Sequence, residues 1–260
     1  MDLNADLGEG FGIWRLGDDD AMLGVVTSAN VACGFHAGDA STMRRVCTTA
    51  AFRGVAIGAQ VSYRDLAGFG RRRIDYDVTE LRDDVLYQIA ALDGIARVAG
   101  SRVKYVKPHG ALYNTAADDA AQAKAVARAV ADYDTSLPVL GLPGSQLLRA
   151  AEAAGLRTVA EGFADRGYLP SGRLVPRSRQ DALVTDVKTV AARAVAMATG
   201  EIVAVDGTML AQRVESICVH GDTPGAVALA TSVRRALSHA GVELVPFAAD
   251  DEPPSDDGPW

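Results

Sequence analysis

The segment at residues 2–12 reads DLNADLGEGFG, and it sets the pattern that decides the fold. Residues 2–7 form a predicted β-strand, which ends at glycines and a glutamate. Similar short segments rich in β-branched residues recur along the chain, and alanine-rich stretches with helical periodicity follow them. This alternation predicts βα units that build a parallel sheet.

The same pattern divides the rest of the chain into expected elements. The predicted strands are residues 2–7, 28–33, 55–60, 105–109, 138–142, 157–162 and 216–220, with 242–246 as an eighth. The predicted helices are residues 41–53, 79–99, 117–133, 145–154, 182–198 and 225–240. Start signals support two of them, because Asp77 with Glu80 resembles a capping box and Thr223 precedes a proline at a first helical position.

Length and repeat number favour a single α/β domain. The 260 residues contain many βα repeats and no linker rich in glycine and serine, which predicts one closed (β/α) barrel over residues 1–249. An open sheet with a second domain is the alternative. The last segment, residues 250–260, reads DDEPPSDDGPW and is predicted to be a disordered acidic tail.

Composition and charge exclude several classes of partner. The chain is 48% hydrophobic and 23% charged, and its formal net charge is −7. An acidic chain has no general attraction for nucleic acid or anionic membranes. No apolar run reaches the roughly 18 residues of a membrane span, and the start of the chain lacks a signal-peptide pattern. Three scattered cysteines fit a reducing compartment, so we expect a cytoplasmic protein.

Polar residues gather where the predicted strands end, which is where barrel enzymes build their active sites. Three of the four histidines belong to this set. Its members are Asn4, Asp6, Glu9, Asn30, His36, Asp39, Gln60, Ser62, Tyr63, Asp65, Lys107, His109, Asn114, Glu161, Asp165, Arg166, His220 and Asp222. So many acids and imidazoles at one end of a barrel indicate a site rather than a set of separate structural residues.

Strand alternation places some of these side chains on shared faces. Residues two apart point the same way, so Asn4 lies beside Asp6 and Lys107 beside His109. An ionised group in a barrel interior needs a partner, and Asp6 and Lys107 can satisfy each other.

Simpler structural explanations remain open for several members. Asp39 and Asp222 each precede a predicted helix and can be capping residues. The arginines at 71–73 form a basic run of the kind that is usually solvated, although one can bind a carboxylate or phosphate. The glycines of Gly68-Phe69-Gly70 serve as turn residues or let the backbone approach a ligand closely.

Familiar catalytic motifs are missing from the sequence. It has no G-x-x-x-x-G-K-[ST] phosphate loop, no dinucleotide fingerprint after a strand, no G-x-S-x-G elbow, no H-E-x-x-H and no paired C-x-x-C. What remains is acid–base chemistry by histidine and carboxylates, with or without a metal ion.

Six ordered blocks of sequence resemble the LamB/YcsF family. They are DLNADLGEGFG at 2–12, SANVACGFHAGD at 28–39, SYRDLAGFGRR at 62–72, VKPHGALYN at 106–114, EGFADRGYLPSGRLVPR at 161–177 and ICVHGDTPGA at 217–226. The resemblance covers nearly the whole chain. It implies a distorted seven-stranded barrel of the glycoside hydrolase/deacetylase type.

The resemblance also implies an activity, namely the ATP-dependent opening of 5-oxo-L-proline to L-glutamate together with partner subunits B and C. ATP would then be a co-substrate handled with the partners, and the need for a divalent metal stays open. The candidates for proton transfer or metal binding are Asp6, Glu9, His36, His109 and His220. The candidates for substrate binding are Asn4, Asn30, Gln60, Tyr63, Arg72, Lys107, Asn114, Glu161, Asp165, Arg166 and Asp222.

One departure from the family pattern bears on the chemistry. The family usually reads GAHPSYPD where this chain has Gln60 and Val61 in place of histidine and proline. Glutamine forms hydrogen bonds, but it is a poor ligand for transition metals and no general base. Two alternatives stay open: a non-catalytic binding or regulatory subunit, which the Gln60 substitution allows, and a stand-alone metal-dependent deacetylase or related hydrolase, which the superfamily suggests. The second is weakened because Ala40 stands four residues after His36, where such deacetylases carry another histidine.

Overall fold

The chain folds as a closed barrel of seven parallel strands in a computed structural model that describes residues 1–220 and 225–248. The barrel strands, in order, are β1 (Asp2–Leu7), β2 (Ser28–Ala32), β3 (Ala56–Val61), β4 (Val103–Pro108), β5 (Val139–Gly141), β6 (Thr158–Phe163) and β9 (Ser216–Val219). β9 closes the barrel by pairing with both β1 and β6. This confirms the predicted seven-stranded β/α barrel.

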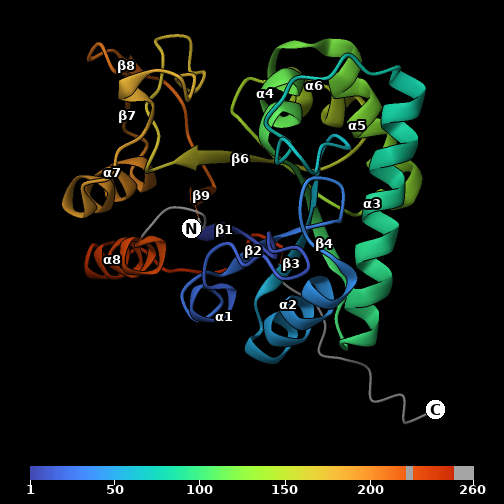
Figure 1. The fold of residues 1–260 in the computed structure, drawn as a ribbon. Coiled ribbons are helices and arrows are strands. Elements are labelled where there is room, and N and C mark those ends of the chain that lie inside the picture. Colours follow the sequence, from blue (N-terminus) through green and yellow to red (C-terminus); the bar gives the residue numbers. More distant parts are fainter. Residues whose placement is uncertain (221–224, 249–260) are drawn as a thin grey trace.

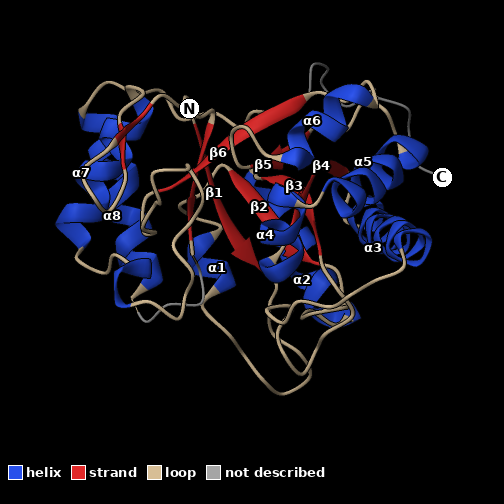
Figure 2. Cartoon of the chain, turned by 90° about the horizontal axis from the view of Figure 1, so that it is seen from above, coloured by secondary structure: helices blue, strands red, loops and turns tan. Residues whose placement is uncertain are grey.

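Helices cover the outside of the barrel (Figures 1 and 2). They are α1 (Asp19–Met22), α2 (Ala40–Arg53), α3 (Val78–Val98), α4 (Gly110–Asp118), α5 (Ala120–Tyr133), α6 (Gln146–Ala153), α7 (Val187–Ala198) and α8 (Ala226–His239). A two-stranded sheet of β7 (Ile202–Val203) and β8 (Met209–Leu210) lies in the connection between β6 and β9. In Figure 1 this connection and α7 lie at the left, beyond the arrowhead of β6, and α4, α5 and α6 lie at the right.

Three predicted elements were wrong in extent or type. The helix expected at 117–133 begins only at Ala120, where Asp119 caps α5, and it is preceded by an unpredicted helix, α4, that begins at Gly110. The helix expected at 182–198 begins only at Val187, where the Asp186 carboxylate accepts from the Thr189 amide. Residues 242–246 form no strand, although the Val245 amide donates to the Met1 carbonyl.

The capping predictions had different outcomes. The Asp77 side chain accepts from the amides of Thr79 and Glu80 and so caps α3 as expected. The predicted caps at Asp222 and Thr223, and the predicted tail at 250–260, lie outside the described residues.

Strand alternation divides the barrel into an apolar exterior and a layered interior. At the bottom, Ala56, Tyr105, Leu140 and Val159 pack inside the strands against Phe247. Gly58 makes room for the Tyr105 ring, because a Cβ at position 58 would lie 2.2 Å from that ring. An apolar plug therefore closes the end of the barrel where the strands begin.

A polar layer lies above the plug. The Asp2 carboxylate accepts from Ser28 Oγ at 2.6 Å and also from Ser216 Oγ. The Asn4 side chain donates to Ser216 Oγ at 2.7 Å and accepts from Asn30 Nδ2 at 2.7 Å. These hydrogen-bonded side chains form the floor on which the charged groups rest.

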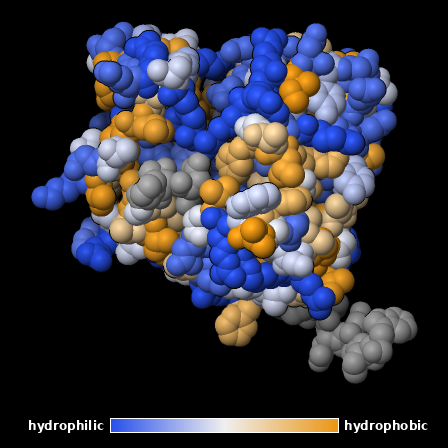
Figure 3. All heavy atoms as spheres, viewed as in Figure 1, coloured by the Kyte–Doolittle hydropathy of each residue, from blue (hydrophilic) through white to orange (hydrophobic). Residues whose placement is uncertain are grey.

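Hydrophilic and apolar residues alternate over the face seen in Figure 3. Among the helices of the described residues, none is long and apolar enough to cross a bilayer.

Candidate functional site

A cavity of about 600 Å³ opens where the barrel strands end. Its wall comes from β1, the loop after β3, the end of β4, α4, the loop after β6 and the residue that follows β9. The polar residues that line it are Asp6, Arg71, Arg73, Lys107, His109, Tyr113, Asn114, Thr115, Asp118, Arg166, Ser171, Arg173, Arg177 and His220. The cavity thus brings together residues that lie far apart in the sequence.

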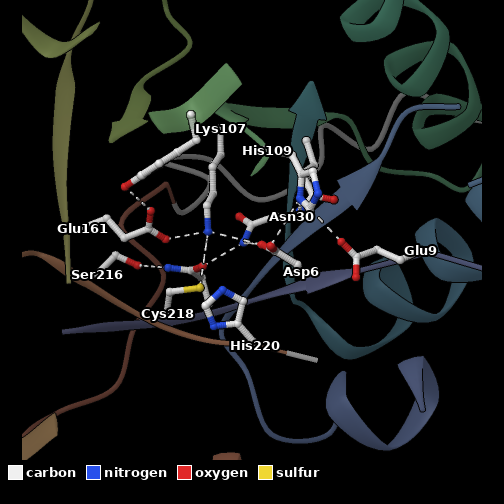
Figure 4. A network of polar contacts seen from close by, with 12 residues as sticks. Asp6, Glu9, Asn30, Lys107, His109, Glu161, Ser216, Cys218 and His220 are labelled. Atoms are coloured by element: carbon white, nitrogen blue, oxygen red, sulfur yellow. Dashed lines mark hydrogen bonds and ion pairs between the residues drawn. The ribbon is translucent and has the colours of Figure 1, made fainter. Parts of the chain in front are cut away.

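A buried cation between two carboxylates forms the base of the cavity (Figure 4). Lys107 Nζ lies 2.6 Å from Glu161 Oε1 and 3.2 Å from Asp6 Oδ1. Burial alone would lower the pKa of Lys107, but the carboxylates outweigh it and hold that pKa well above its ordinary value. Burial would likewise raise the pKa of Asp6, but the Lys107 cation outweighs it and holds that pKa well below the ordinary value. Lys107 is therefore a cation and Asp6 an anion at neutral pH.

Neutral neighbours complete this cluster. Asn4 Oδ1 and Cys218 Sγ each lie 3.3 Å from Lys107 Nζ, and the Tyr113 hydroxyl donates to Glu161 Oε2 at 2.8 Å. Asn30 Nδ2 donates to Asp6 Oδ1 at 2.9 Å. Buried charges are stable only with such a shell of partners, so the inward-facing polar residues of the strands serve to hold Lys107.

A histidine–carboxylate pair stands at the cavity wall. Asp165 Oδ2 lies 2.7 Å from His220 Nδ1 and also accepts from the His220 amide at 3.2 Å. Burial would raise the pKa of Asp165, but His220 outweighs it and keeps that pKa below its ordinary value. Because a carboxylate only accepts, Nδ1 carries the proton and Nε2 is the ring nitrogen left for the cavity.

A second pair of histidines is joined by Gln60. The rings of His36 and His109 stack with centroids 4.0 Å apart. His109 Nε2 lies 3.1 Å from the Phe69 carbonyl, His109 Nδ1 lies 3.0 Å from Gln60 Nε2, and His36 Nε2 lies 3.2 Å from Gln60 Oε1.

The direction of this chain of hydrogen bonds follows from its one fixed acceptor. The Phe69 carbonyl can only accept, so His109 Nε2 carries a hydrogen; in the neutral ring Nδ1 then accepts from the Gln60 amide. The Gln60 oxygen in turn accepts from His36 Nε2. Burial holds the pKa of His36 well below its ordinary value, so His36 is neutral at pH 7.

The backbone at residues 69 and 70 is shaped for these hydrogen bonds. Phe69 has a φ of 54°, a region that side chains rarely adopt. A Cβ on Gly70 would lie 2.9 Å from His36 Cβ and 3.0 Å from His109 Cδ2. Gly70 therefore lets the backbone approach both histidines closely, which is one of the two roles that the sequence suggested.

Glu9, His36 and His109 have the residue types and spacing of a metal site. One potential ligand atom from each lies within 4.8 Å of the others. Two imidazoles and a carboxylate suit zinc and related ions. The same ring nitrogens that approach Glu9, namely His36 Nε2 and His109 Nδ1, are bonded to Gln60, so a bound ion would have to replace those hydrogen bonds.

Not all predicted site residues face the cavity. Tyr63 is fully buried outside it, with its ring stacked on Tyr76 and its hydroxyl bonded to Gln122. Arg72 pairs with Asp65 on the surface, and it is absent from the cavity wall. The prediction that these two contact substrate from the cavity does not agree with where they lie, because the loop after β3 turns Tyr63 toward α5.

The remaining members take several positions. Asp39 caps α2 by accepting from the Thr42 amide, which confirms its structural explanation. Asn114 lines the cavity and donates to the Gly110 carbonyl. Glu161 and Asp165 stand behind Lys107 and His220 rather than in the wall.

Sequence reasoning missed several wall residues. Tyr113, Arg173 and Arg177 line the cavity, as do Arg71 and Arg73 from the basic run. All of them fall within the family-like blocks or directly beside one, and Arg71 and Arg73 also belong to the basic run in which one member was expected to be able to bind an anion. Surface arginines look alike in a sequence, so their convergence required the fold.

Known proteins resemble this chain over almost its full length. The sequence profile of the LamB/YcsF family matches residues 1–252. A protein named as the A subunit of 5-oxoprolinase, from Mycobacterium avium (strain 104), is 63% identical over 248 residues, which cover 95% of this chain and 98% of that protein. A protein of the same name from Streptomyces avermitilis is 61% identical over 249 residues, covering 95% and 100% of the two chains.

A solved structure has the same fold as this chain. The crystal structure of the lactam utilization protein from Thermus thermophilus superposes with a TM-score of 0.90 at 43% identity. The match covers 95% of this chain and 99% of that one.

Proposed function

Because the chain belongs to the LamB/YcsF family, we propose that it acts on 5-oxo-L-proline as the A subunit of a multi-subunit 5-oxoprolinase, in which the lactam is opened to L-glutamate. One observation carries the proposal. The cavity at the strand ends holds a histidine with its carboxylate partner, His220 and Asp165, together with the Asp6–Lys107 ion pair. The first group can move protons, and the second presents fixed charges to a polar substrate.

The ring opening needs more driving force than hydrolysis of an ordinary ester, because a lactam carbonyl is stabilised by resonance and its amine is a poor leaving group. In the proposed scheme ATP phosphorylates the lactam oxygen and releases ADP. Water then adds to the ring carbon, the C–N bond breaks with a proton passing to nitrogen, and a second water releases inorganic phosphate. The sequence has no phosphate loop, which supports shared handling of ATP with partner subunits B and C.

We assign the proton transfers to His220. Its Nε2 takes a proton from the attacking water, and the imidazolium is stabilised by Asp165 Oδ2 at 2.7 Å. The same proton can then pass to the departing ring nitrogen, so the histidine returns to its starting state. Lys107 stabilises negative charge that develops on the substrate oxygen, since it is held as a cation.

The stand-alone metal hydrolase remains the second candidate, because Glu9, His36 and His109 fit a divalent ion. Such an ion would supply Lewis acidity and an activated water. The hydrogen bonds of Gln60 to both histidines favour the metal-independent interpretation. Elemental analysis of the purified chain separates the two, since a resident metal would appear near one equivalent.

The test of the main proposal is glutamate release from 5-oxoproline and ATP. It is measured with this chain alone, with subunits B and C, and with His220→Gln. We expect release only in the complete mixture and a large loss in the variant. His239→Gln is the matched control, because His239 ends α8 in an exposed position outside the cavity wall. No turnover in the complete mixture would refute the proposal, and Gln60→His tests the alternative in the same assay.

A further inference from the structure

The cavity wall is strongly cationic although the protein is acidic. Among the described residues, six lysine and arginine side chains and two aspartates line it, in a chain whose net charge is −7. The two aspartates already pair with other wall residues. Asp6 lies 3.2 Å from Lys107 and Asp118 lies 2.8 Å from Arg173. Arg71, Arg73, Arg166 and Arg177 form the rest of the positive wall, and we call these four the arginine rim.

Arg166 is the anchor of the rim. It is only 5% exposed, and its guanidinium donates to the Ala182 carbonyl at 3.0 Å and the Val175 carbonyl at 2.7 Å. Both acceptors are neutral, so the bonds fix the orientation of the group without cancelling its charge. A buried arginine that lines a cavity and is held in place by carbonyls is arranged to meet a negative ligand.

Like charges crowd around this anchor. Burial first, then the charges of Arg177 and Arg71, lower the pKa of Arg166 to about 10, although the Asp165 carboxylate acts in the opposite direction. Arg166 is still a cation at neutral pH, and the wall keeps cations near one another at a cost in free energy. An anionic ligand would relieve that repulsion when it binds.

We propose that the arginine rim binds a phosphoryl group, and this inference rests on the proposed function because the group would belong to the phosphorylated lactam. A single substrate carboxylate carries one negative charge, whereas a phosphoryl group carries close to two and offers three acceptor oxygens. Several planar guanidinium groups match such a ligand better than they match a carboxylate. The rim therefore holds the activated substrate with its phosphoryl group at the rim and its ring toward Lys107 and His220.

A nucleotide is a second source of the same chemistry, since ATP also presents phosphoryl groups. The rim then would hold the terminal phosphate of the nucleotide during transfer. The arginines would recognise the phosphoryl group in the same way in both cases. The two cases differ in one respect: a nucleotide competes for the site only if the site binds a nucleotide phosphate.

Binding of inorganic phosphate to the full chain, measured by titration calorimetry, tests the rim. The variant is Arg73→Gln with Arg177→Gln, because both side chains are exposed. Arg235→Gln on the outer part of α8 is the matched control. We expect the phosphate Kd to rise at least tenfold in the double variant and to stay within twofold in the control.

Arg166→Lys provides a second readout that keeps the charge but loses the guanidinium geometry. We expect it to weaken phosphate binding severalfold while thermal unfolding shows a folded chain. Magnesium AMP-PNP is then added as competitor. Rim-dependent displacement of phosphate assigns the site to a nucleotide phosphate, and its absence assigns the site to the activated lactam; both outcomes support the rim.

Two results would overturn the inference: no phosphate binding at millimolar concentration, or equal binding by the wild type and the double variant. The proposed function fails separately. If the wild type neither bound 5-oxoproline nor released glutamate but still showed rim-dependent phosphate binding, the proposed activity would be contradicted. The rim would then be an anion-binding site with another function.

Discussion

Replacement of Asp165 by asparagine tests the histidine–carboxylate pair without altering the cavity wall. Asp165 is absent from that wall and reaches substrate only through His220, to which it is bonded at Nδ1 and at the backbone amide. Asparagine has nearly the same shape and can keep one of these bonds through its oxygen. It carries no charge, so it cannot stabilise the imidazolium that forms when His220 takes a proton.

The size of the effect follows from the kind of bond that is lost. A hydrogen bond to a charged group contributes about 1.5–3 kcal/mol, and about 1.36 kcal/mol changes a rate tenfold. The 2.7 Å contact is buried, so solvent screening reduces this little. We therefore expect kcat to fall roughly 10- to 160-fold. KM should change less than threefold, because the substrate-facing side chains stay in place.

The assay is steady-state glutamate release by the complete enzyme. Asp132→Asn is the control, since Asp132 pairs with Arg82 on the outer surface and its loss should leave kcat unchanged. If Asp165→Asn kept kcat within twofold of the wild type while His220→Gln abolished it, the carboxylate would have no part in proton transfer. A rise in KM with kcat intact would also contradict the reasoning, because it would place Asp165 in substrate binding.

Three further predictions concern stability and are measured by urea unfolding. Gly58→Ala should lower the free energy of unfolding by about 1–3 kcal/mol, because the new Cβ would overlap the Tyr105 ring, whereas Gly94→Ala in open space on α3 should raise it by about 0.5–1 kcal/mol. Lys107→Gln should cost about 3–5 kcal/mol, since it leaves two buried carboxylates without their cation, and a loss below 1 kcal/mol would contradict the ion-pair assignment. The pKa of Asp165 lies below its ordinary value, so the stability that this group contributes is full above about pH 4 and is lost as the pH falls through the folded pKa. The loss of unfolding free energy in Asp165→Asn should accordingly be largest at neutral pH and should shrink on acidification.

The sequence predicted the barrel well because the strands obey a local rule. Each combines alternating side chains with a glycine or polar end, and that is enough to place Asn4 beside Asp6 and to bring Lys107 toward Asp6. The start of α4 was missed for an equally local reason. Gly110 directly after a strand resembles a turn, and only the structure shows that it opens a helix with a φ of 57°.

The roles within the site were harder to predict, because they depend on which way a loop carries its side chains. Tyr63 follows β3 among polar residues and yet packs into the core. Asp165 and His220 are 55 positions apart, so no spacing rule joins them. Arg71, Arg72 and Arg73 are adjacent in the sequence, and the loop sends the first and third to the cavity while the second pairs with Asp65.

The polar interior of the barrel is best understood as support for Asp6. Replacement of buried ion pairs by well-packed apolar residues is often neutral or stabilising in proteins, so stability alone does not explain why they are there. The arrangement instead divides the two oxygens of one carboxylate. Oδ1 is held by Lys107 and Asn30, and Oδ2 points toward His109 Nδ1 at 3.6 Å. A carboxylate fixed in this way stays ionised and cannot turn, so it presents one oxygen in a constant direction at the cavity edge, where a substrate or water can meet it.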